Sequence, residues 1–172
     1  GVPLASETRA LDLGCAVGRS TFELTKHFQH VTGIDYSHAF VQAGDDLKKL
    51  GALPYAALSE AASSVQLEAH LPQDCHAERA HFEQGDAMNL RADLGSFDLV
   101  HAANLLCRLP DPSRLLSRLP ELVRPGGQLL LTTPCTWLAE FTPPEHWPAG
   151  TTRAWLTEHL TQDFVLQQEQ DM

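Results

Sequence analysis

The sequence predicts a doubly wound α/β fold, in which helices cover both faces of a Rossmann-like, mostly parallel sheet. Segments typical of strands and helices alternate along most of the 172 residues. The strand segments are continuous apolar runs, which is typical of parallel strands buried on both faces. We expect a single domain over residues 1–172, because this length suits one hydrophobic core. The chain stops near the sixth strand of such a fold, so we expect the last strand to be absent.

The order of elements follows from hydrophobic periodicity and from residues that begin or end helices. Strands are expected at 8–13, 30–35, 81–83, 96–104, 128–133 and 164–170, with the run at 128–133 buried. Helices are expected at 19–28, 38–50 and 151–160, and another is opened by Asp111 and Pro112 and closed by the Pro-Gly-Gly of 125–127. Residues 52–80 interrupt the alternation. This insertion is expected to be either a lid hairpin over a substrate or a linker without a role.

The charge balance excludes two classes of partner. Hydrophobic residues make up 43% of the chain, while 12 basic residues against 22 acidic ones give a formal net charge of −10. This charge repels phosphate backbones and anionic lipids, and no local basic patch offsets it. Neither nucleic acid nor a membrane is therefore expected as a partner.

Targeting and metal-binding patterns are absent from the sequence. No apolar run reaches the roughly 18 residues that a membrane span needs, and the first residues lack a secretion signal. We therefore expect a cytoplasmic protein. The four cysteines form no CxxC pair and the nine histidines form no HxxxH or HExxH pair, so no metal site is expected.

A glycine turn follows the first expected strand in LDLGCAVGRS. An acidic residue and three small residues stand at every second position, as Asp12, Gly14, Ala16 and Gly18. Small residues let the backbone turn tightly and approach a ligand before the next helix begins. A nicotinamide fingerprint would need glycine at positions 14, 16 and 19, and only Gly14 meets it. The spacing favours S-adenosylmethionine instead, with Cys15 also placed in the turn.

An aspartate ends the second expected strand. Asp35 comes about twenty residues after the glycine turn, where a carboxylate can accept hydrogen bonds from a ribose diol. A helix cap is the alternative role, but Ser37 is available to cap the next helix. We predict that Asp35, Tyr36 and Ser37 belong to the cofactor site, with Tyr36 either flanking the adenine or packing as a half-buried tyrosine.

The third and fourth strand ends carry further candidates. We predict that Asp86 accepts a hydrogen bond from the adenine amine while Ala87 and Met88 line the base, although Asp86 by itself would be an ordinary turn residue. After the fourth strand, Asn104 is predicted to hold the methionine moiety or to orient the methyl acceptor, beside Leu105, with a helix cap as its alternative role.

The segments quoted above resemble the class I S-adenosylmethionine-dependent methyltransferases. Read in order, RALDLGCAVGRSTFELTKHF, VTGIDYS, FEQGDAMNL, FDLVHAANLLCRLPDP, RPGGQLLLTTP and TWLAEFTPPEHW look like the C-terminal methyltransferase domain of ovothiol synthase. That family methylates an imidazole ring nitrogen of mercaptohistidine. The resemblance runs from Thr8 to Trp147, and it implies a small-molecule N-methyltransferase that acts on mercaptohistidine or a related histidine derivative.

The loop at 133–150 is the acceptor side implied by this resemblance. Its aromatic residues can hold a flat heterocycle and attract the sulfonium charge. Glu140 and His146, with Asn104, are the catalytic candidates, since either can hydrogen-bond a ring nitrogen; surface residues of a packed loop are the alternative. The predicted substrate-binding residues are Arg108, Cys135, Trp137, Phe141 and Trp147. Arg108 has a salt bridge with Asp111 as its alternative.

Two cysteines depart from the pattern of the ovothiol synthase family. Cys135 stands where that family tends to carry tyrosine, and Cys107 stands where it tends to carry aspartate. Both are expected at the mouth of the site. Two other functions therefore stay open: a methyltransferase for another small amine, thiol or hydroxyl, and an inactive cofactor-binding pseudoenzyme. The sheet edge is expected to be exposed, cut short, or covered by a homo-oligomer or another partner.

Overall fold

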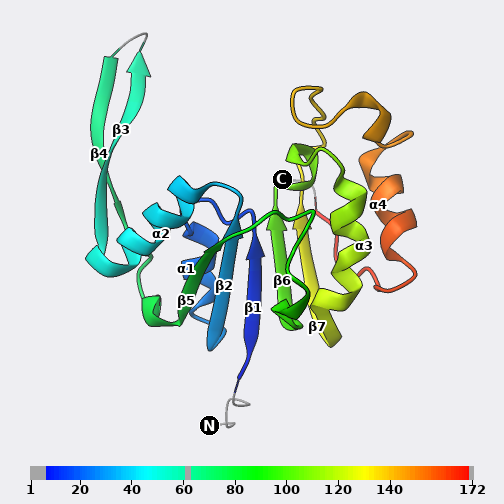
Figure 1. Cartoon of the computed structure of the whole chain (residues 1–172), viewed down its shortest axis with the longest axis horizontal. Helices are drawn as coiled ribbons and strands as arrows, with labels where there is room; N and C mark the ends of the chain where they lie inside the picture. Colours follow the sequence, from blue (N-terminus) through cyan, green and yellow to red (C-terminus); the bar gives the residue numbers. More distant parts are fainter. Residues whose placement is uncertain (1–6, 61–62, 171–172) are drawn as a thin grey trace. The chain divides into compact units, whose positions relative to one another are not determined.

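The computed structural model describes residues 7–60 and 63–170. The chain divides into two compact units, Gly1–Ala87 and Met88–Met172 (Figure 1). Short 3₁₀ helices occur in both units, at η1 (Ala77–Arg79), η2 (Ala92–Leu94), η3 (Leu106–Arg108) and η4 (Pro144–His146). The two units are described separately.

The first unit alternates parallel strands and helices. Its elements are β1 (Arg9–Leu13), α1 (Arg19–Leu24), β2 (His30–Asp35), α2 (His38–Leu50) and β5 (Ala80–Gln84). The strands follow the order β5-β2-β1, and both pairs are parallel, with Ala10 opposite Val31 and Val31 opposite Ala80. Parallel neighbours need a crossover connection, which α1 provides between β1 and β2. The predicted α/β arrangement is confirmed, although α1 ends at Leu24 and not at residue 28.

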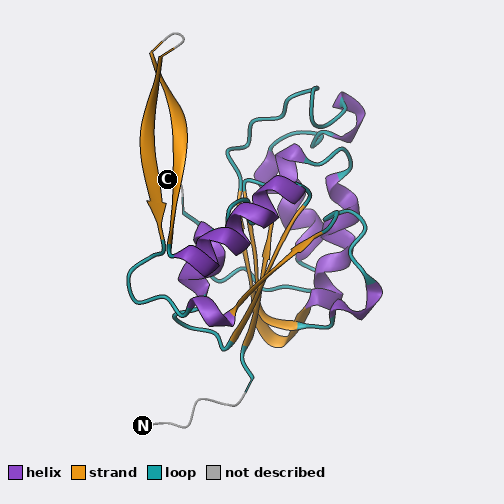
Figure 2. Ribbon diagram, turned by 60° about the vertical axis from the view of Figure 1, so that its left-hand side comes forward, coloured by secondary structure: helices purple, strands orange, loops and turns teal. Residues whose placement is uncertain are grey.

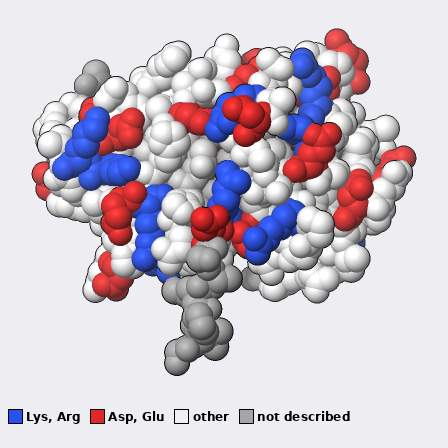
Figure 3. All heavy atoms as spheres, turned by 60° about the horizontal axis from the view of Figure 1, so that its bottom comes forward, with Lys and Arg blue, Asp and Glu red and all other residues white. Residues whose placement is uncertain are grey.

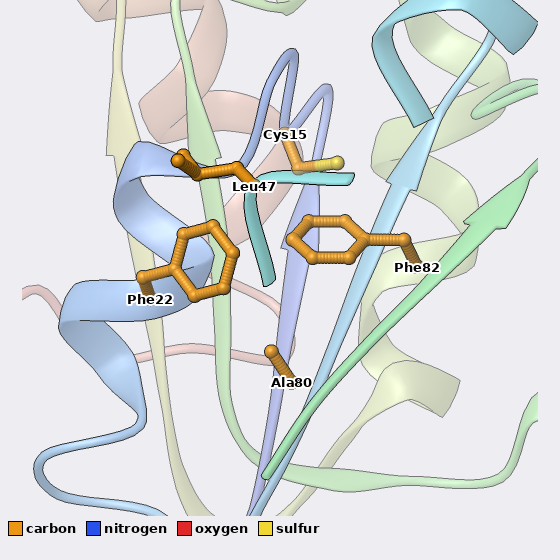
Figure 4. Close-up of a cluster of buried hydrophobic side chains, with 5 residues drawn as sticks. All are labelled: Cys15, Phe22, Leu47, Ala80 and Phe82. Carbon is orange, nitrogen blue, oxygen red and sulfur yellow. The ribbon is translucent and has the colours of Figure 1, made fainter. Parts of the chain in front are cut away.

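The core of the first unit contains two phenylalanines that meet edge to face. Phe22 of α1 and Phe82 of β5 have ring centroids 5.4 Å apart at an interplanar angle of 63°, an arrangement that aromatic pairs favour. Cys15, Leu47 and Ala80 complete this buried cluster (Figure 4). The cluster therefore joins the glycine turn, both helices and the far strand of the unit.

The insertion at 52–80 contains a long antiparallel hairpin, which is followed by η1 and the start of β5. Its strands are β3 (Ala52–Glu60) and β4 (Ser63–His70), which form a two-stranded sheet of their own in the described chain (Figure 2). The hairpin starts at Gly51, whose left-handed backbone conformation ends α2. At its base, the Leu71 N–H donates to the Gly51 carbonyl at 3.1 Å, and Leu53 packs against the buried cluster.

The second unit contains two parallel strands and two helices. β6 (Phe97–Ala103) pairs with β7 (Val123–Thr132), and α3 (Pro112–Leu122) connects them, followed by α4 (Thr152–Leu160). Leucines at helical spacing on α3 are buried, at positions 115, 116, 119 and 122. This confirms the predicted helix start at Pro112. The helix ends at Leu122, because β7 begins at Val123 and runs through the Pro-Gly-Gly segment that was expected to close the helix.

Two expected strands differ from the structure. The run at 128–133 was expected to be buried, but Leu130 is 50% exposed because β7 is the last strand in its sheet order. Residues 164–170 form no strand. Val165 and Leu166 are exposed, and Arg153 of α4 forms an ion pair with Glu169. Without a strand partner, a short apolar run does not form a ladder.

Acidic and basic side chains are interspersed on the face shown in Figure 3. Many of the charges are paired locally, as in the ion pairs of Arg19 with Glu23 and of Arg91 with Asp93. Among the described residues, no helix combines the length and the apolar character that crossing a membrane requires.

Candidate functional site

The glycine turn after β1 has the backbone conformation that its sequence predicts. Gly14, Ala16 and Gly18 all have positive φ, at 69°, 47° and 92°, a region that residues with a Cβ rarely adopt. The N–H groups of Gly14 and Cys15 donate to the Ile34 carbonyl at 2.8 and 3.1 Å. These bonds fix the turn against the end of β2.

Gly18 is required by close packing as well as by its backbone angle. A Cβ at this position would lie 2.5 Å from Cζ of Phe82 and 2.6 Å from its Cε1. Gly18 is also the N-cap of α1, and the Phe22 N–H donates to its carbonyl at 2.9 Å. Glycine therefore lets the helix start directly on the aromatic core, beneath the turn.

Asp35 links the glycine turn to the end of β2. One carboxylate oxygen accepts the Ala16 N–H at 2.8 Å, and the other accepts the Ser37 N–H at 2.9 Å. Each oxygen has a further lone pair with which it can accept a hydroxyl. The half-buried carboxylate thus fits the ribose diol of S-adenosylmethionine while its geometry is already fixed by the backbone.

The two residues after Asp35 have different surroundings. The Ser37 side chain accepts the Phe40 N–H at 3.3 Å and caps α2, which is the helix-capping role expected of it. Tyr36 is exposed, so it is not the half-buried packing tyrosine of the alternative interpretation. Its ring is free to flank a ligand.

Two predicted cofactor residues lie inside the first unit. Asp12 is buried, and its carboxylate accepts the Thr21 hydroxyl at 2.7 Å. Cys15 is buried beside it. Burial raises the pKa of the Cys15 thiol from 9.0 to about 12, and the negative charges of Asp12 and Asp35 add to the rise. Cys15 therefore stays a neutral thiol, and Asp12 and Thr21 support the turn from within.

The end of β5 lies beside the end of β2. The Gly85 N–H donates to the Asp35 carbonyl at 3.0 Å, which brings the half-buried Asp86 and Ala87 to the same end of the first unit as Asp35. Met88 begins the second unit, where its sulfur accepts the Asp111 N–H at 3.4 Å. Asp86 and Ala87 thus lie beside the end of β2, whereas Met88 contacts Asp111 in the second unit.

In the second unit, Asn104 ends β6 in a left-handed conformation. Its φ is 55°, its side chain is exposed, and its N–H donates to the Thr132 carbonyl of β7 at 2.8 Å. Asparagine tolerates this conformation better than most residues with a Cβ. The half-buried Leu105 follows, and then comes η3, which carries Arg108.

Arg108 and Phe141 form a cation–π contact. The guanidinium carbon of Arg108 lies 4.6 Å from the centroid of the Phe141 ring, and both side chains are exposed. Such contacts contribute about 0.5–1 kcal/mol at exposed sites. The contact joins η3 to the loop at 133–150, so these two predicted substrate-binding residues lie together.

The tryptophans of the loop at 133–150 use their ring N–H groups to hold the loop. Trp137 donates to the Thr152 hydroxyl at 2.8 Å and packs edge to face on Trp155, with ring centroids 5.8 Å apart. Trp147 donates to the Thr142 carbonyl at 2.7 Å. Both indoles therefore offer ring surface rather than hydrogen bonds to any ligand.

The two polar candidates of this loop are both exposed. A ring nitrogen of His146, Nδ1, lies 2.7 Å from the Pro110 carbonyl, so Nδ1 carries the proton and Nε2 remains as an acceptor when the ring is neutral. Glu140 is exposed on a turn of the loop. His146 is thus the better positioned of the two.

The two cysteines that depart from the family pattern lie in different surroundings. Cys135 is exposed and has a φ of 54°. Cys107 is fully buried, with its sulfur 3.9 Å from the Asn104 carbonyl. The expectation that Cys107 lies at the mouth is therefore wrong, because the turn of η3 directs this position into the core of the second unit.

Sequence reasoning missed two buried threonines whose hydroxyls join segments of the candidate site. Thr21 donates to Asp12, and Thr142 donates to the Leu109 carbonyl at 2.7 Å. Threonine is more often exposed, so neither position gave a signal. The EFTP stretch contains Thr142, and this contact joins the loop to η3.

Comparison with known proteins gives the family. A family described as "Methyltransferase domain" matches residues 2–164. The trans-aconitate 2-methyltransferase of Deinococcus radiodurans is 35% identical over 77% of this chain and 40% of its own length. A ubiquinone biosynthesis O-methyltransferase of Aromatoleum aromaticum is 31% identical over 73% of this chain and 43% of its length. The chain thus spans about two fifths of these relatives, and they give no support to ovothiol synthase in particular.

Solved structures show the same fold. The [4+2]-cyclase SpnF is 23% identical and has a TM-score of 0.62 over 93% of this chain and 52% of its own. A methyltransferase of Methanosarcina mazei is 25% identical, with a TM-score of 0.54 over 74% of this chain and 53% of its own. These similarities confirm the predicted Rossmann-like α/β fold. The family match includes both units, and it makes the chain a member of the class I S-adenosylmethionine-dependent methyltransferases.

Proposed function

We propose that this chain transfers a methyl group from S-adenosylmethionine to a small-molecule acceptor. The observation that carries the proposal is the Asp35 carboxylate, which the Ala16 and Ser37 N–H groups hold at 2.8 and 2.9 Å beside a turn with three positive φ angles. A carboxylate so positioned binds a ribose diol without further reorganisation.

The cofactor supplies an activated methyl group on a sulfonium sulfur. The residues of this chain bind it, orient the acceptor and exclude water, since a nucleophile with a free lone pair needs positioning more than a strong base. Asp35 and Asp86 are the proposed ribose and adenine residues in the first unit. Asn104 is the proposed positioning residue in the second unit, where its exposed side chain leaves a left-handed turn.

The first acceptor to test is the imidazole of mercaptohistidine or a related histidine derivative. Three aromatic residues of the loop at 133–150, Trp137, Phe141 and Trp147, offer ring surface for a flat heterocycle. Nε2 of His146 is available to accept a hydrogen bond from the acceptor, because Nδ1 faces Pro110. These features and the resemblance of the loop to ovothiol synthase support this acceptor.

A polycarboxylate acceptor without an imidazole ring is the second candidate. The relatives above include a trans-aconitate 2-methyltransferase. In this chain, Arg108 presents an exposed guanidinium over Phe141, and such a group can bind a carboxylate with two parallel hydrogen bonds. Because a histidine derivative also carries a carboxylate, Arg108 is compatible with both candidate acceptors.

Two measurements test the proposal in sequence. Calorimetric titration with S-adenosylhomocysteine is expected to show saturable binding to one site, and no detectable binding would refute every methyltransferase function. Mass spectrometry of a panel containing histidine, mercaptohistidine, carnosine, simple thiols and trans-aconitate then identifies the acceptor. Binding without methylation of any candidate would favour the pseudoenzyme. A methylated acid beside unmodified mercaptohistidine would reject the imidazole in favour of the second candidate.

A further inference from the structure

A buried hydrogen bond joins the end of β1 to the first turn of α1. The Thr21 hydroxyl donates to a carboxylate oxygen of Asp12 at 2.7 Å, and the two side chains are 0% and 2% exposed. Among the residues that the structure describes, Asp12 is the only buried carboxylate. Burying such groups costs free energy, and replacing a buried polar pair with apolar residues is often neutral or stabilising. Stability alone therefore does not explain why this pair is polar.

Gly33 of β2 leaves the space that the Thr21 hydroxyl occupies. A Cβ on Gly33 would lie 2.7 Å from Oγ1 of Thr21 and 3.0 Å from Sγ of Cys15. Gly33 is also the residue opposite Asp12 in the parallel register of β1 and β2. The strand beside β1 is thus shaped around the hydrogen bond, since any larger residue at position 33 would displace the hydroxyl.

This hydrogen bond closes the glycine turn, because Asp12 precedes the turn and Thr21 follows it, nine positions later. The bond fixes the end of β1 relative to the start of α1, and these two ends set the path of the turn between them. Within the turn, the Ala16 N–H donates to Asp35 at 2.8 Å. A binding residue keeps its productive geometry when other hydrogen bonds and packing hold it in place. Thr21 can therefore influence Asp35 without touching a ligand.

We propose that Thr21 is a positioning residue for S-adenosylmethionine. Its hydroxyl holds Asp12, and through it the glycine turn, in the shape that presents the Asp35 carboxylate to the ribose. This role rests on the proposed cofactor function. It depends on the hydroxyl and not on the volume of the side chain, so serine should replace threonine at position 21 while valine should not.

Two substitutions at position 21 separate the hydroxyl from the side-chain volume. Calorimetric titration of the 172-residue chain with S-adenosylhomocysteine is expected to give a Kd about tenfold higher in Thr21→Val, the scale of one lost hydrogen bond to a charged group. Thr21→Ser keeps the hydroxyl and is expected to bind within about threefold of the natural chain. Thr21→Ala also lacks the hydroxyl, and it gives the same test if Thr21→Val does not fold.

Thr25 offers a matched control at the other end of α1. Its side chain is also 0% exposed, and its hydroxyl donates to the Phe22 carbonyl at 2.6 Å. Thr25 is the C-cap of α1, whereas the glycine turn leads into the N-terminal end of the helix. Thr25→Val should therefore lower the free energy of unfolding in urea, as Thr21→Val does, but leave the Kd for S-adenosylhomocysteine unchanged.

The outcomes distinguish the positioning role from the proposed function. An unchanged Kd in Thr21→Val, or a Thr21→Ser variant that binds as weakly as Thr21→Val, would overturn the positioning role alone. Equal rises of the Kd in Thr21→Val and Thr25→Val would also overturn it, by assigning the effect to lost stability. Absence of binding to the natural chain would instead refute the proposed function, and the positioning role with it.

Discussion

At the residue scale, Asp35 connects the structure of the turn to its proposed chemistry. The carboxylate accepts two backbone N–H groups and is expected to accept the ribose of the cofactor. Asp35→Ala should therefore weaken S-adenosylhomocysteine binding by about 1–3 kcal/mol, the range for unpairing hydrogen bonds to a charged group. Calorimetry measures the change. Asp46→Ala, which removes a partly exposed carboxylate on α2, is the control that should bind normally; unchanged affinity in Asp35→Ala would refute the ribose assignment.

Gly18 allows backbone strain and steric clash to be measured separately. Gly18→Ala should lower the free energy of unfolding by roughly 2–4 kcal/mol, because the new methyl group meets Phe82 at 2.5 Å and the φ of 92° disfavours alanine. Gly51→Ala is the matched control, since its φ is 80° and its Cβ would enter open space. It should lose only about 1 kcal/mol by urea denaturation. Equal losses in the two variants would exclude a clash.

The buried Cys15 thiol predicts a pH dependence of stability. Its pKa is raised from 9.0 to about 12, so the folded chain holds this proton while the unfolded chain releases it near pH 9. The contribution of the Cys15 thiol to the free energy of unfolding is therefore fully present below pH 9 and is lost as the pH rises toward 12. Urea denaturation between pH 7 and 10.5 should show a steeper loss in the natural chain than in Cys15→Ala. Parallel curves would contradict the burial of the thiol as the cause.

At the scale of elements, the sequence correctly predicted the helix ends that depend on interactions within a few residues. Gly51 ends α2 and Pro112 starts α3 as expected, since helix-ending backbone angles and a missing N–H act within a few residues. The apolar residues that begin the segment 164–170 did not produce a strand, because a ladder needs a neighbour that the sequence does not reveal. The burial of Cys107 depends similarly on how η3 turns. The glycine turn could be predicted, whereas the pairing of Thr142 with Leu109 depends on distant segments meeting.

The loop at 133–150 depends on α4 for its shape. Trp155→Ala removes the edge-to-face partner of Trp137 and should cost about 1–2 kcal/mol of stability, given the worth of an aromatic pair and the partial burial of Trp155. If this loop binds the acceptor, the KM for the acceptor should rise several-fold in Trp155→Ala, while the affinity for S-adenosylhomocysteine stays the same. Steady-state kinetics and calorimetry separate the two effects. Trp155→Phe, which keeps an aromatic ring, should restore most of the KM, and a change in cofactor affinity alone would contradict this role.

At the scale of the whole molecule, cofactor binding should stabilise the chain. A ligand at one hundred times its dissociation constant adds about 2.7 kcal/mol to the free energy of unfolding. For a chain of 172 residues this corresponds to a rise in Tm of roughly 5–10 °C. A thermal scan with S-adenosylhomocysteine, and with adenosine as the weaker control, measures the shift. A Tm that does not depend on ligand concentration would argue against a cofactor site on this chain.

The buried thiol within the glycine turn has a consequence for the proposed methyl transfer. A thiolate is a strong nucleophile, and it would itself be alkylated by a sulfonium methyl donor bound nearby. Burial of Cys15, reinforced by two neighbouring carboxylates, lowers the small fraction of thiolate that a thiol with a pKa of 9.0 would hold at physiological pH. If the proposed cofactor binds at this turn, the burial of Cys15 also limits methylation of the chain's own sulfur.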